Sequence, residues 1–372
     1  MAPHWLPTVG ATLVAAVGCA YFWKRRHAGR CSIPQTKPGH EGYAALIGNT
    51  PLVELKSLSR LTGRTILVKC EHLNPGGTGK DRIARAILAE AEANGYLKPG
   101  GTVVEGTSGS TGIALAALCA SRGYCCLIVM PDDQADEKKH LLERFGASVT
   151  QVKTAAIANP SHYVQQAKRL AQQVPGAFFA NQFENLANFR AHLSTTGPEI
   201  WEQARGRVDA FVMSAGTGGT IAGVSQYLRQ MNPAVKTVLA DPPGSSLFHW
   251  AKHGVCWAPQ QAERRVRKHR YDTIAEGIGL DRITANLGEA LIDDAIRVAD
   301  QVSLFLRVDP TGHFSWLLFT EAVARNQLRD LPCPGRREHG PLSHAPRGPL
   351  CRFLQRHERR GRRCLCGEAS SR

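Results

Sequence analysis

Short apolar runs alternate with amphipathic segments through the central part of the chain. A continuous apolar run is typical of a strand buried on both faces of a parallel sheet, and apolar residues at helical spacing are typical of a surface helix. The apolar runs predict strands over residues 65–70, 101–106, 125–131, 147–152, 209–216 and 236–241. The amphipathic segments predict helices over residues 81–96, 111–123, 136–146, 162–174, 198–204 and 223–231, and the charged side chains of 81–96 are expected to face solvent. This alternation predicts the α/β class, with parallel sheets covered by helices on both faces.

The N-terminal segment has a different pattern. Residues 5–23 contain no charged side chain, carry aromatic residues at both ends, and are followed at once by the basic residues 24–26. At 1.5 Å per residue, this run nearly matches a hydrocarbon core of about 30 Å. A signal peptide carries its positive charge before the apolar run, so the order found here favours a transmembrane anchor within residues 1–30, with the rest of the chain in the cytosol. A cleaved signal or transit peptide and a buried helix are the alternatives.

The net charge of +15 does not indicate a nucleic-acid partner, because much of it comes from one segment. Residues 328–372 contain eleven arginines, no lysine and only four acidic residues. The remaining charge is dispersed, without a basic stripe interleaved with aromatic residues, so no nucleic acid is expected. The eleven cysteines lack the spacing of a metal site, and an odd number without a cleavable signal favours reduced, mostly buried thiols. No metal site is predicted.

Two glycine-rich turns lie where a predicted strand gives way to a helix, at residues 105–116 and 214–224. In parallel sheets, ligands bind beyond the carboxyl ends of the strands, where helix N-termini present free N–H groups and the positive end of the helix dipole. Anions are therefore the expected ligands, a phosphate at one turn and a carboxylate at the other. A single turn of this kind can also be a tight strand–helix junction.

A third loop, HLNPGGTGKDR over residues 72–82, contains Lys80. It is not the phosphate loop of nucleoside-triphosphate enzymes, because Asn74 replaces the first glycine of that motif and Asp81 replaces its Ser or Thr. A lysine together with a phosphate site and a carboxylate site is typical of enzymes in which the lysine forms an imine with an aldehyde cofactor. The freed lysine would then be the general base for an amino-acid substrate. The alternative is a solvated lysine paired with Asp81.

Seven segments resemble, in order and spacing, the cysteine synthase and cystathionine β-synthase family of pyridoxal-phosphate enzymes of fold type II. They are residues 47–55 (IGNTPLVEL), 74–84, 107–116, 181–188, 195–203, 214–220 and 276–283 (EGIGLDRI). The most similar members are membrane-anchored cysteine synthase-like proteins. The resemblance implies pyridoxal 5'-phosphate as cofactor, two parallel-sheet α/β domains within residues 45–300, and a homodimer. It also implies that a smaller domain, at about residues 85–183, closes over the cofactor.

The resemblance assigns roles to individual residues. Lys80 matches the Schiff-base lysine, and Gly277 matches the residue that lines the pocket opposite the cofactor ring. Ser110 stands where the family has an asparagine that bonds the ring oxygen of the cofactor. The segment that matches the phosphate loop comprises Gly216, Thr217, Gly218, Gly219 and Thr220. The residues that match the substrate-carboxylate site are Thr107, Ser108, Gly109, Thr111 and Gln182.

The chain departs from the family at three places. The Ser110 hydroxyl is shorter than the family asparagine, and Gly79 replaces an apolar residue before the lysine, which adds backbone freedom. After Asp300 the family's serine segment, which meets the pyridine nitrogen, is absent. The tail, residues 301–372, is rich in Arg and Pro and reads either as a basic disordered arm or as a wrong reading frame. We hypothesise a frameshift or mis-spliced junction between Asp300 and Thr320.

The function expected from this resemblance is β-replacement on serine or O-acetylserine, through an aminoacrylate, with sulfide or another thiol. Serine/threonine dehydration and cysteine desulfhydration on the same cofactor are alternatives, and a catalytically inactive membrane-tethered relative is another. The missing serine segment favours the inactive alternative if the tail is genuine. The short basic flank of the anchor favours the mitochondrial outer membrane, with the endoplasmic reticulum as the alternative.

Overall fold

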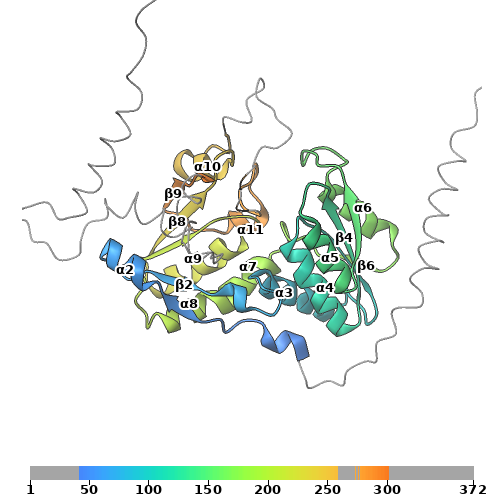
Figure 1. Ribbon diagram of the computed structural model, residues 1–372, viewed down its shortest axis with the longest axis horizontal. Coiled ribbons are helices and arrows are strands. Elements are labelled where there is room, and N and C mark those ends of the chain that lie inside the picture. The colour runs from blue at the N-terminus through green and yellow to red at the C-terminus, as the bar shows by residue number, and fades with distance from the viewer. Residues whose placement is uncertain (1–41, 259–272, 274, 276, 301–372) are drawn as a thin grey trace, which may run out of the picture. The chain divides into compact units, whose positions relative to one another are not determined.

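The computed structural model describes residues 42–258, 273, 275 and 277–300 (Figure 1). The expected membrane anchor at residues 5–23 and the Arg- and Pro-rich tail at 301–372 lie outside these residues, and so does the hypothesised frameshift junction. Within the described ranges, no helix has the length and the apolar character needed to cross a bilayer.

The first parallel sheet has the strand order β5-β4-β3-β6. Thr102 of β3 lies opposite Cys125 of β4 on one side and Ala177 of β6 on the other. The strands are β3 (Thr102–Gly106), β4 (Cys125–Pro131), β5 (Ser148–Val152) and β6 (Ala177–Phe179). Residues 126–131 of β4 are all buried, as the continuous apolar run predicts.

Helices cover both faces of this sheet, which confirms the predicted architecture (Figure 1, green). Val103 packs with Ile83 and Leu115 on one face, whereas Val104 packs with Ala167 on the other. The helices are α3 (Lys80–Ala93), α4 (Ser110–Arg122), α5 (Asp136–Arg144) and α6 (Tyr163–Gln173). The alternation of Val103 and Val104 between two cores follows from the two-residue period of a strand.

The second parallel sheet has the order β7-β8-β9, and β8 pairs with both neighbours. Its strands are β7 (Ala210–Met213), β8 (Lys236–Asp241) and β9 (Asp294–Arg297). The segments that follow or precede these strands are α7 (Ala187–Ala191), the π-helix η3 (His192–Thr196), α8 (Gly197–Gln203), α9 (Gly219–Met231), α10 (Leu247–His253) and α11 (Ala285–Gly288). Leu239 of β8 and Ile221 of α9 belong to the same buried hydrophobic core.

The N-terminal part of the described chain corrects one expectation. The strand predicted over residues 65–70 is present as β2 (Leu67–Lys69), but it pairs antiparallel with β1 (Leu52–Glu54) and belongs to neither parallel sheet. Between them lies α2 (Lys56–Thr62), which ends at Gly63 with a φ of 69°. Two short 3-10 helices, η1 (Gly42–Leu46) and η2 (Glu71–Leu73), complete this region.

Several short elements escaped prediction. These are β1, β6, β9, α2, α7, α10 and α11, the longest of which has seven residues. Such lengths hold too few residues to establish a period. The strand expected over 209–216 ends at Met213, and the helix expected from residue 223 begins at Gly219. The four-stranded sheet spans residues 102–179, and the division into a large domain and a mobile domain at about 85–183 stays a prediction.

Candidate active site

Lys80 is the first residue of α3 and follows the loop of residues 74–79. Gly79 has a φ of −64°, so the backbone freedom expected of this glycine is not used. Asp81 does not pair with the lysine. Its Oδ2 accepts a hydrogen bond from the Gly76 backbone N at 2.6 Å, and a Cβ on Gly76 would lie 2.3 Å from its Oδ1. Asp81 therefore holds the loop in place from inside the helix.

The environment of the Lys80 amine favours its uncharged form. Burial lowers the pKa of Lys80, and the negative charge of Glu71 opposes part of this shift. In the described ranges, the Lys80 side chain makes no hydrogen bond and no ion pair. A neutral amine is the nucleophilic and basic form of lysine, so this position suits covalent or general-base chemistry.

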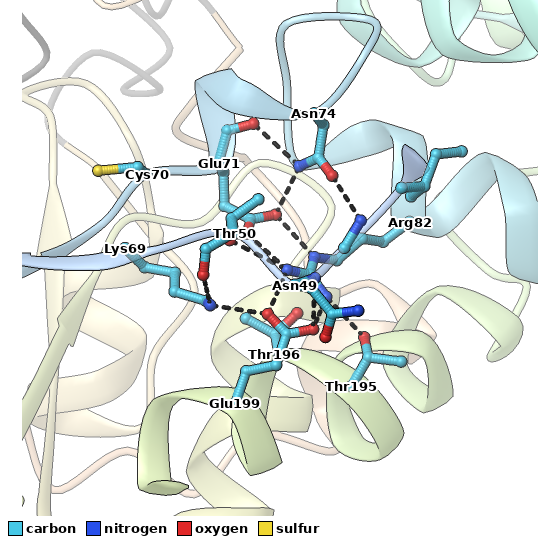
Figure 2. A network of polar contacts seen from close by, with 12 residues as sticks. Asn49, Thr50, Lys69, Cys70, Glu71, Asn74, Arg82, Thr195, Thr196 and Glu199 are labelled. Atoms are coloured by element: carbon cyan, nitrogen blue, oxygen red, sulfur yellow. Dashed lines mark hydrogen bonds and ion pairs between the residues drawn. The ribbon is translucent and has the colours of Figure 1, made fainter. Parts of the chain in front are cut away.

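A buried ion-pair network surrounds Arg82, two residues after the lysine (Figure 2). Arg82 is 1% exposed, so the predicted solvent-facing position is wrong for it and for Asp81, which is 0% exposed. Its Nε and Nη2 donate to Glu71 at 2.9 and 2.8 Å. Its Nη1 and Nη2 donate to Glu199 at 2.6 and 2.7 Å. Two bidentate carboxylates thus compensate the burial of one guanidinium.

The network shifts the titration of its members. Burial alone would raise the pKa of Glu199, but hydrogen bonds from Arg82 and Lys69 lower it to about 2. Burial likewise opposes the hydrogen bonds of Arg82 at Glu71, and the net effect lowers the pKa of Glu71. Asn74 Nδ2 donates to Glu71 Oε2 at 3.1 Å, so the network also anchors the start of the lysine loop.

The predicted substrate-carboxylate site lies between β3 and the N-terminus of α4. Thr107 Oγ1 accepts from the Gly109 backbone N at 3.2 Å, and Thr111 Oγ1 donates to Gln182 Oε1 at 2.5 Å. Gly109 has a φ of 154°, and a Cβ there would lie 2.9 Å from Cδ of Lys138 on α5. In the described part of the chain, the hydroxyls of Ser108 and Ser110 make no hydrogen bond, so they are available to a ligand.

The buried carboxyl group of Glu105 holds Gln182, a residue of this predicted site, in place. Gln182 Nε2 donates to Glu105 Oε1 at 3.2 Å and to the Gly106 carbonyl at 3.1 Å. The Gln182 backbone N donates to Glu105 Oε2 at 3.3 Å. Burial raises the pKa of Glu105 to about 8, so the group is mostly protonated at neutral pH. Sequence reasoning missed Glu105, because a lone acidic residue at a strand end carries no recognisable signal.

The predicted phosphate loop is a cradle that admits only glycine at three places. A Cβ on Gly216 would lie 2.2 Å from the Gly277 carbonyl oxygen, which places Gly277 beside this loop. A Cβ on Gly218, where φ is 89°, would lie 2.5 Å from the Leu287 side chain. A Cβ on Gly219 would lie 2.0 Å from Asn188 Oδ1. The thirteen-residue helix α9 begins at Gly219, so the loop ends at free backbone N–H groups.

His192 contacts the predicted phosphate loop. Its Nε2 is 3.1 Å from Thr220 Oγ1, and its Nδ1 is 2.8 Å from Thr196 Oγ1. Burial lowers the pKa of His192 to about 3; the Glu71 charge opposes the shift, and the positive charge of Lys80 contributes to it. His192 is therefore neutral, and its ring is held between Thr196 and Thr220, which belongs to the predicted phosphate loop. In the sequence, His192 stands just before the TTGPEIW segment, and no local pattern marks it as a functional residue.

Hydrogen bonds join the two predicted anion sites. Asn188 Nδ2 donates to the Gln182 carbonyl at 2.9 Å and to Thr217 Oγ1 at 2.8 Å. Thr111, Gln182, Asn188 and Thr217 thus form one buried chain of contacts. The residues fit pyridoxal phosphate: the glycine cradle and helix N-terminus suit the phosphate, and the deprotonated form of Lys80 suits the aldehyde.

Comparison with known proteins agrees with this fit. The family model "pyridoxal-phosphate dependent enzyme" matches residues 43–304. Cysteine synthase 2 of Schizosaccharomyces pombe is 50% identical over 271 residues, which cover 70% of this chain and 69% of that protein. Cysteine synthase 2 of Neurospora crassa is 50% identical over 275 residues, which cover 70% of this chain and 60% of that protein. The chain thus spans only part of the length of these relatives.

Two solved structures also match the chain. O-ureido-L-serine synthase matches with a TM-score of 0.66 and 32% identity, covering 79% of this chain and 89% of that one. A hydrogen sulfide-producing enzyme from Fusobacterium nucleatum matches with a TM-score of 0.61 and 31% identity, covering 72% and 83%. The family match, which extends over most of the chain and includes every residue of this site, assigns the chain to the family of pyridoxal-phosphate dependent enzymes.

Proposed function

We propose that this protein is a cysteine synthase, which replaces the β-substituent of serine or O-acetylserine with sulfide or another thiol. The observation that carries the proposal is the 50% identity to cysteine synthase 2 over the segment that builds the site. The site adds chemical support, because it combines an amine of lowered pKa with two anion-binding turns.

The phosphate loop and the lysine have separate tasks in this proposal. Gly216–Thr220 hold the phosphate through backbone N–H groups at the start of α9 and through the hydroxyls of Thr217 and Thr220. When bound, the cofactor supplies an electron-withdrawing ring that stabilises negative charge at Cα of the substrate. Lys80 Nζ takes the proton from that Cα, which requires the uncharged amine that burial favours.

The carboxylate site orients the amino acid. Thr107, Ser108, Gly109 and Thr111 surround the N-terminus of α4, where free N–H groups and the helix dipole attract the α-carboxylate. Gln182 is held against Thr111 and is proposed as a second contact for the same group. Both Nε2 hydrogens of Gln182 are donated to Glu105 and to the Gly106 carbonyl, so this contact requires one of them to turn to the ligand. Ser110 lies on the first turn of α4 and is the residue proposed to bond the ring oxygen. Gly277, whose carbonyl lies next to Gly216, is proposed to line the cofactor pocket.

Cysteine desulfhydration is the second candidate. It is favoured by the likeness to the hydrogen sulfide-producing enzyme of Fusobacterium nucleatum. Both reactions use the same binding of the amino acid and the same proton transfer at Cα, so the residues of the site serve either one. Incubation with cysteine alone separates the two, because only desulfhydration then releases sulfide and pyruvate.

The cellular location of the enzyme and its oligomeric state are also proposals. Residues 5–23 would anchor the protein in a membrane with the catalytic region in the cytosol, and the mitochondrial outer membrane is favoured over the endoplasmic reticulum. The support is the uncharged run followed by basic residues, and a Saccharomyces cerevisiae relative, 46% identical, that has "mitochondrial cysteine synthase" in its name. The active form would be a homodimer. Cell fractionation with and without residues 1–30, and light scattering of the purified chain, test these points.

The test of the activity uses the full chain purified with pyridoxal phosphate. We expect visible absorption from the lysine-bound cofactor and production of cysteine from O-acetylserine and sulfide. Lys80→Ala should abolish that absorption and lower turnover by at least about 100-fold. Lys98→Ala, at an exposed lysine, is the control and should change neither. A colourless wild-type protein would contradict the proposal, and a coloured protein without turnover would indicate an inactive relative.

A further inference from the structure

Asn188 is a fully buried amide that touches both anion-binding regions. It is 0% exposed and lies in α7, and its Nδ2 donates to the Gln182 carbonyl at 2.9 Å and to Thr217 Oγ1 at 2.8 Å. Gln182 belongs to the carboxylate site and Thr217 to the phosphate loop. One NH₂ group therefore connects the backbone of one site with a hydroxyl of the other.

The Gln182 carbonyl determines which way the amide of Asn188 faces. A carbonyl oxygen only accepts hydrogen bonds, and its two lone pairs serve Asn188 Nδ2 and Asn286 Nδ2, the latter at 3.1 Å. The flipped amide would bring two oxygens to that separation without a proton between them. The nitrogen must therefore face Gln182, and the same nitrogen then faces Thr217.

This orientation determines the role of the Thr217 hydroxyl. Because its oxygen accepts from Asn188, its own hydrogen points elsewhere. Thr217 is 6% exposed, and within the described part of the chain its hydroxyl has no acceptor. The Thr217 carbonyl accepts from Thr284 Oγ1 at 2.7 Å, which fixes the backbone beneath the hydroxyl. The hydroxyl is thus a donor held in place without a protein partner.

The amide oxygen of Asn188 shows that this orientation is unfavourable for one of its atoms. Asn188 Oδ1 is buried and has no hydrogen-bond partner among the described residues, which is unfavourable in a protein interior. It faces Gly219, where a Cβ would lie 2.0 Å away. The chain therefore leaves an acceptor unpaired in order to place two N–H donors at Gln182 and Thr217. A side chain that only filled space would not need this arrangement.

We propose that Asn188 is a positioning residue that makes the Thr217 hydroxyl a dedicated hydrogen-bond donor to the phosphate of the cofactor, and that it ties the phosphate loop to the carboxylate site. The inference rests on the proposed function in that the loop holds pyridoxal phosphate. It predicts that the contribution of Asn188 depends on the phosphate group and not on the aldehyde or the ring.

The experiment compares two ligands that differ only in the phosphate. Apoprotein of the full chain is titrated with pyridoxal phosphate and with pyridoxal, and binding is followed by visible absorption and by equilibrium dialysis. In Asn188→Asp, oxygens replace the donors, so the Thr217 hydroxyl turns toward residue 188. We expect pyridoxal phosphate to bind at least about 10-fold more weakly, as for the loss of a hydrogen bond to a charged group, and pyridoxal to bind within about 3-fold of wild type.

Three further variants make the result specific. Thr217→Val should show the same phosphate-dependent loss, Thr217→Ser should retain affinity, and Asn188→Asp combined with Thr217→Val should be no worse than either alone. Asn286→Asp is the matched control, because Asn286 is 0% exposed and donates to the same carbonyl, but its side chain makes no hydrogen bond with Thr217 in the described part of the chain. It should affect both ligands alike. If Asn188→Asp does not fold, Asn188→Ala replaces it, with a phosphate-dependent loss expected again.

The outcomes separate this inference from the proposed function. Equal losses for both ligands, an unchanged affinity for pyridoxal phosphate in Asn188→Asp, or additive effects of the two substitutions would each overturn the role of Asn188 while leaving cofactor binding intact. A phosphate-dependent loss in Asn286→Asp would do the same. A wild-type protein that binds neither ligand would overturn the proposed function and this inference together.

Discussion

Arg82 and Glu199 lie 117 residues apart in the chain and form a two-point ion pair, with Nη1 to Oε1 at 2.6 Å and Nη2 to Oε2 at 2.7 Å. The guanidinium is completely buried, and Glu71 holds its opposite edge. Since Lys80 and Arg82 lie in the same helical turn, this pair fixes the start of α3 and with it the backbone that carries the lysine.

Removing Arg82 should destabilise the fold strongly. Arg82→Met leaves the partly buried Glu71 without its cation and leaves Glu199 with Lys69 alone, and we expect a loss of about 3–5 kcal/mol in the free energy of unfolding. Urea unfolding followed by circular dichroism measures it. Lys153→Ala, which breaks the pair of an 87% exposed lysine with Asp132, is the control and should cost less than about 1 kcal/mol. Equal unfolding midpoints for the two variants would contradict the structural role of Arg82.

The stability of the fold should fall in acid through Glu199. Its pKa in the folded protein is about 2, below the value of about 4.3 expected in the unfolded chain. The folded state therefore binds fewer protons, so Glu199 stabilises the fold above about pH 4.3, and this contribution is lost as the pH falls toward 2. Unfolding midpoints at several pH values should decline less steeply in Glu199→Gln than in wild type. Glu54→Gln, at an exposed strand end, should keep the wild-type slope.

Glu105 should control the binding of the amino-acid substrate through Gln182. Glu105→Leu removes the two carboxyl oxygens that accept from Gln182 and leaves only the Gly106 carbonyl, so we expect the KM for O-acetylserine to rise by about 10-fold while the visible absorption of the bound cofactor is unchanged. Glu105→Gln keeps one acceptor and should change the KM by less than about 3-fold. Val104→Ala, on the opposite face of β3, tests for a general packing effect. Equal KM values in Glu105→Leu and wild type would reject this role.

Close helix packing should make Gly223 irreplaceable. A Cβ on Gly223 in α9 would lie 2.5 Å from the Leu193 backbone N and 2.6 Å from the Phe189 carbonyl, and backbone atoms cannot move aside cheaply. We expect Gly223→Ala to lower the free energy of unfolding by about 1–3 kcal/mol. Since the proposed phosphate loop leads into α9, the affinity of the protein for pyridoxal phosphate should fall as well.

Gly288 provides the control for this substitution. A Cβ there would meet nothing within 4 Å, so Gly288→Ala should leave the unfolding midpoint unchanged or raise it slightly. If Gly223→Ala unfolds at the same urea concentration as Gly288→Ala, the contact between α9 and the π-helix is looser than the structure indicates.

The sequence by itself determined those parts that depend on neighbouring residues. The strands at 125–131 and 236–241 were predicted residue for residue, because short apolar stretches between polar boundaries favour buried strands of a parallel sheet. Lys80 and the two glycine-rich turns were also visible, since a glycine-rich junction between a strand and a helix is a local pattern. The family resemblance then supplied the cofactor, and the family match bears it out.

Only the tertiary structure decided which polar groups are buried and what they contact. The helix pattern placed Arg82 in solvent, and it is buried because Glu199 approaches from a distant segment. Glu105 and Asn188 gained their roles from Gln182 and Thr217, which lie far from them in sequence or on other elements. A local pattern records how apolar a segment is, whereas the cost of burying a charge or an amide depends on the partners that folding brings to it.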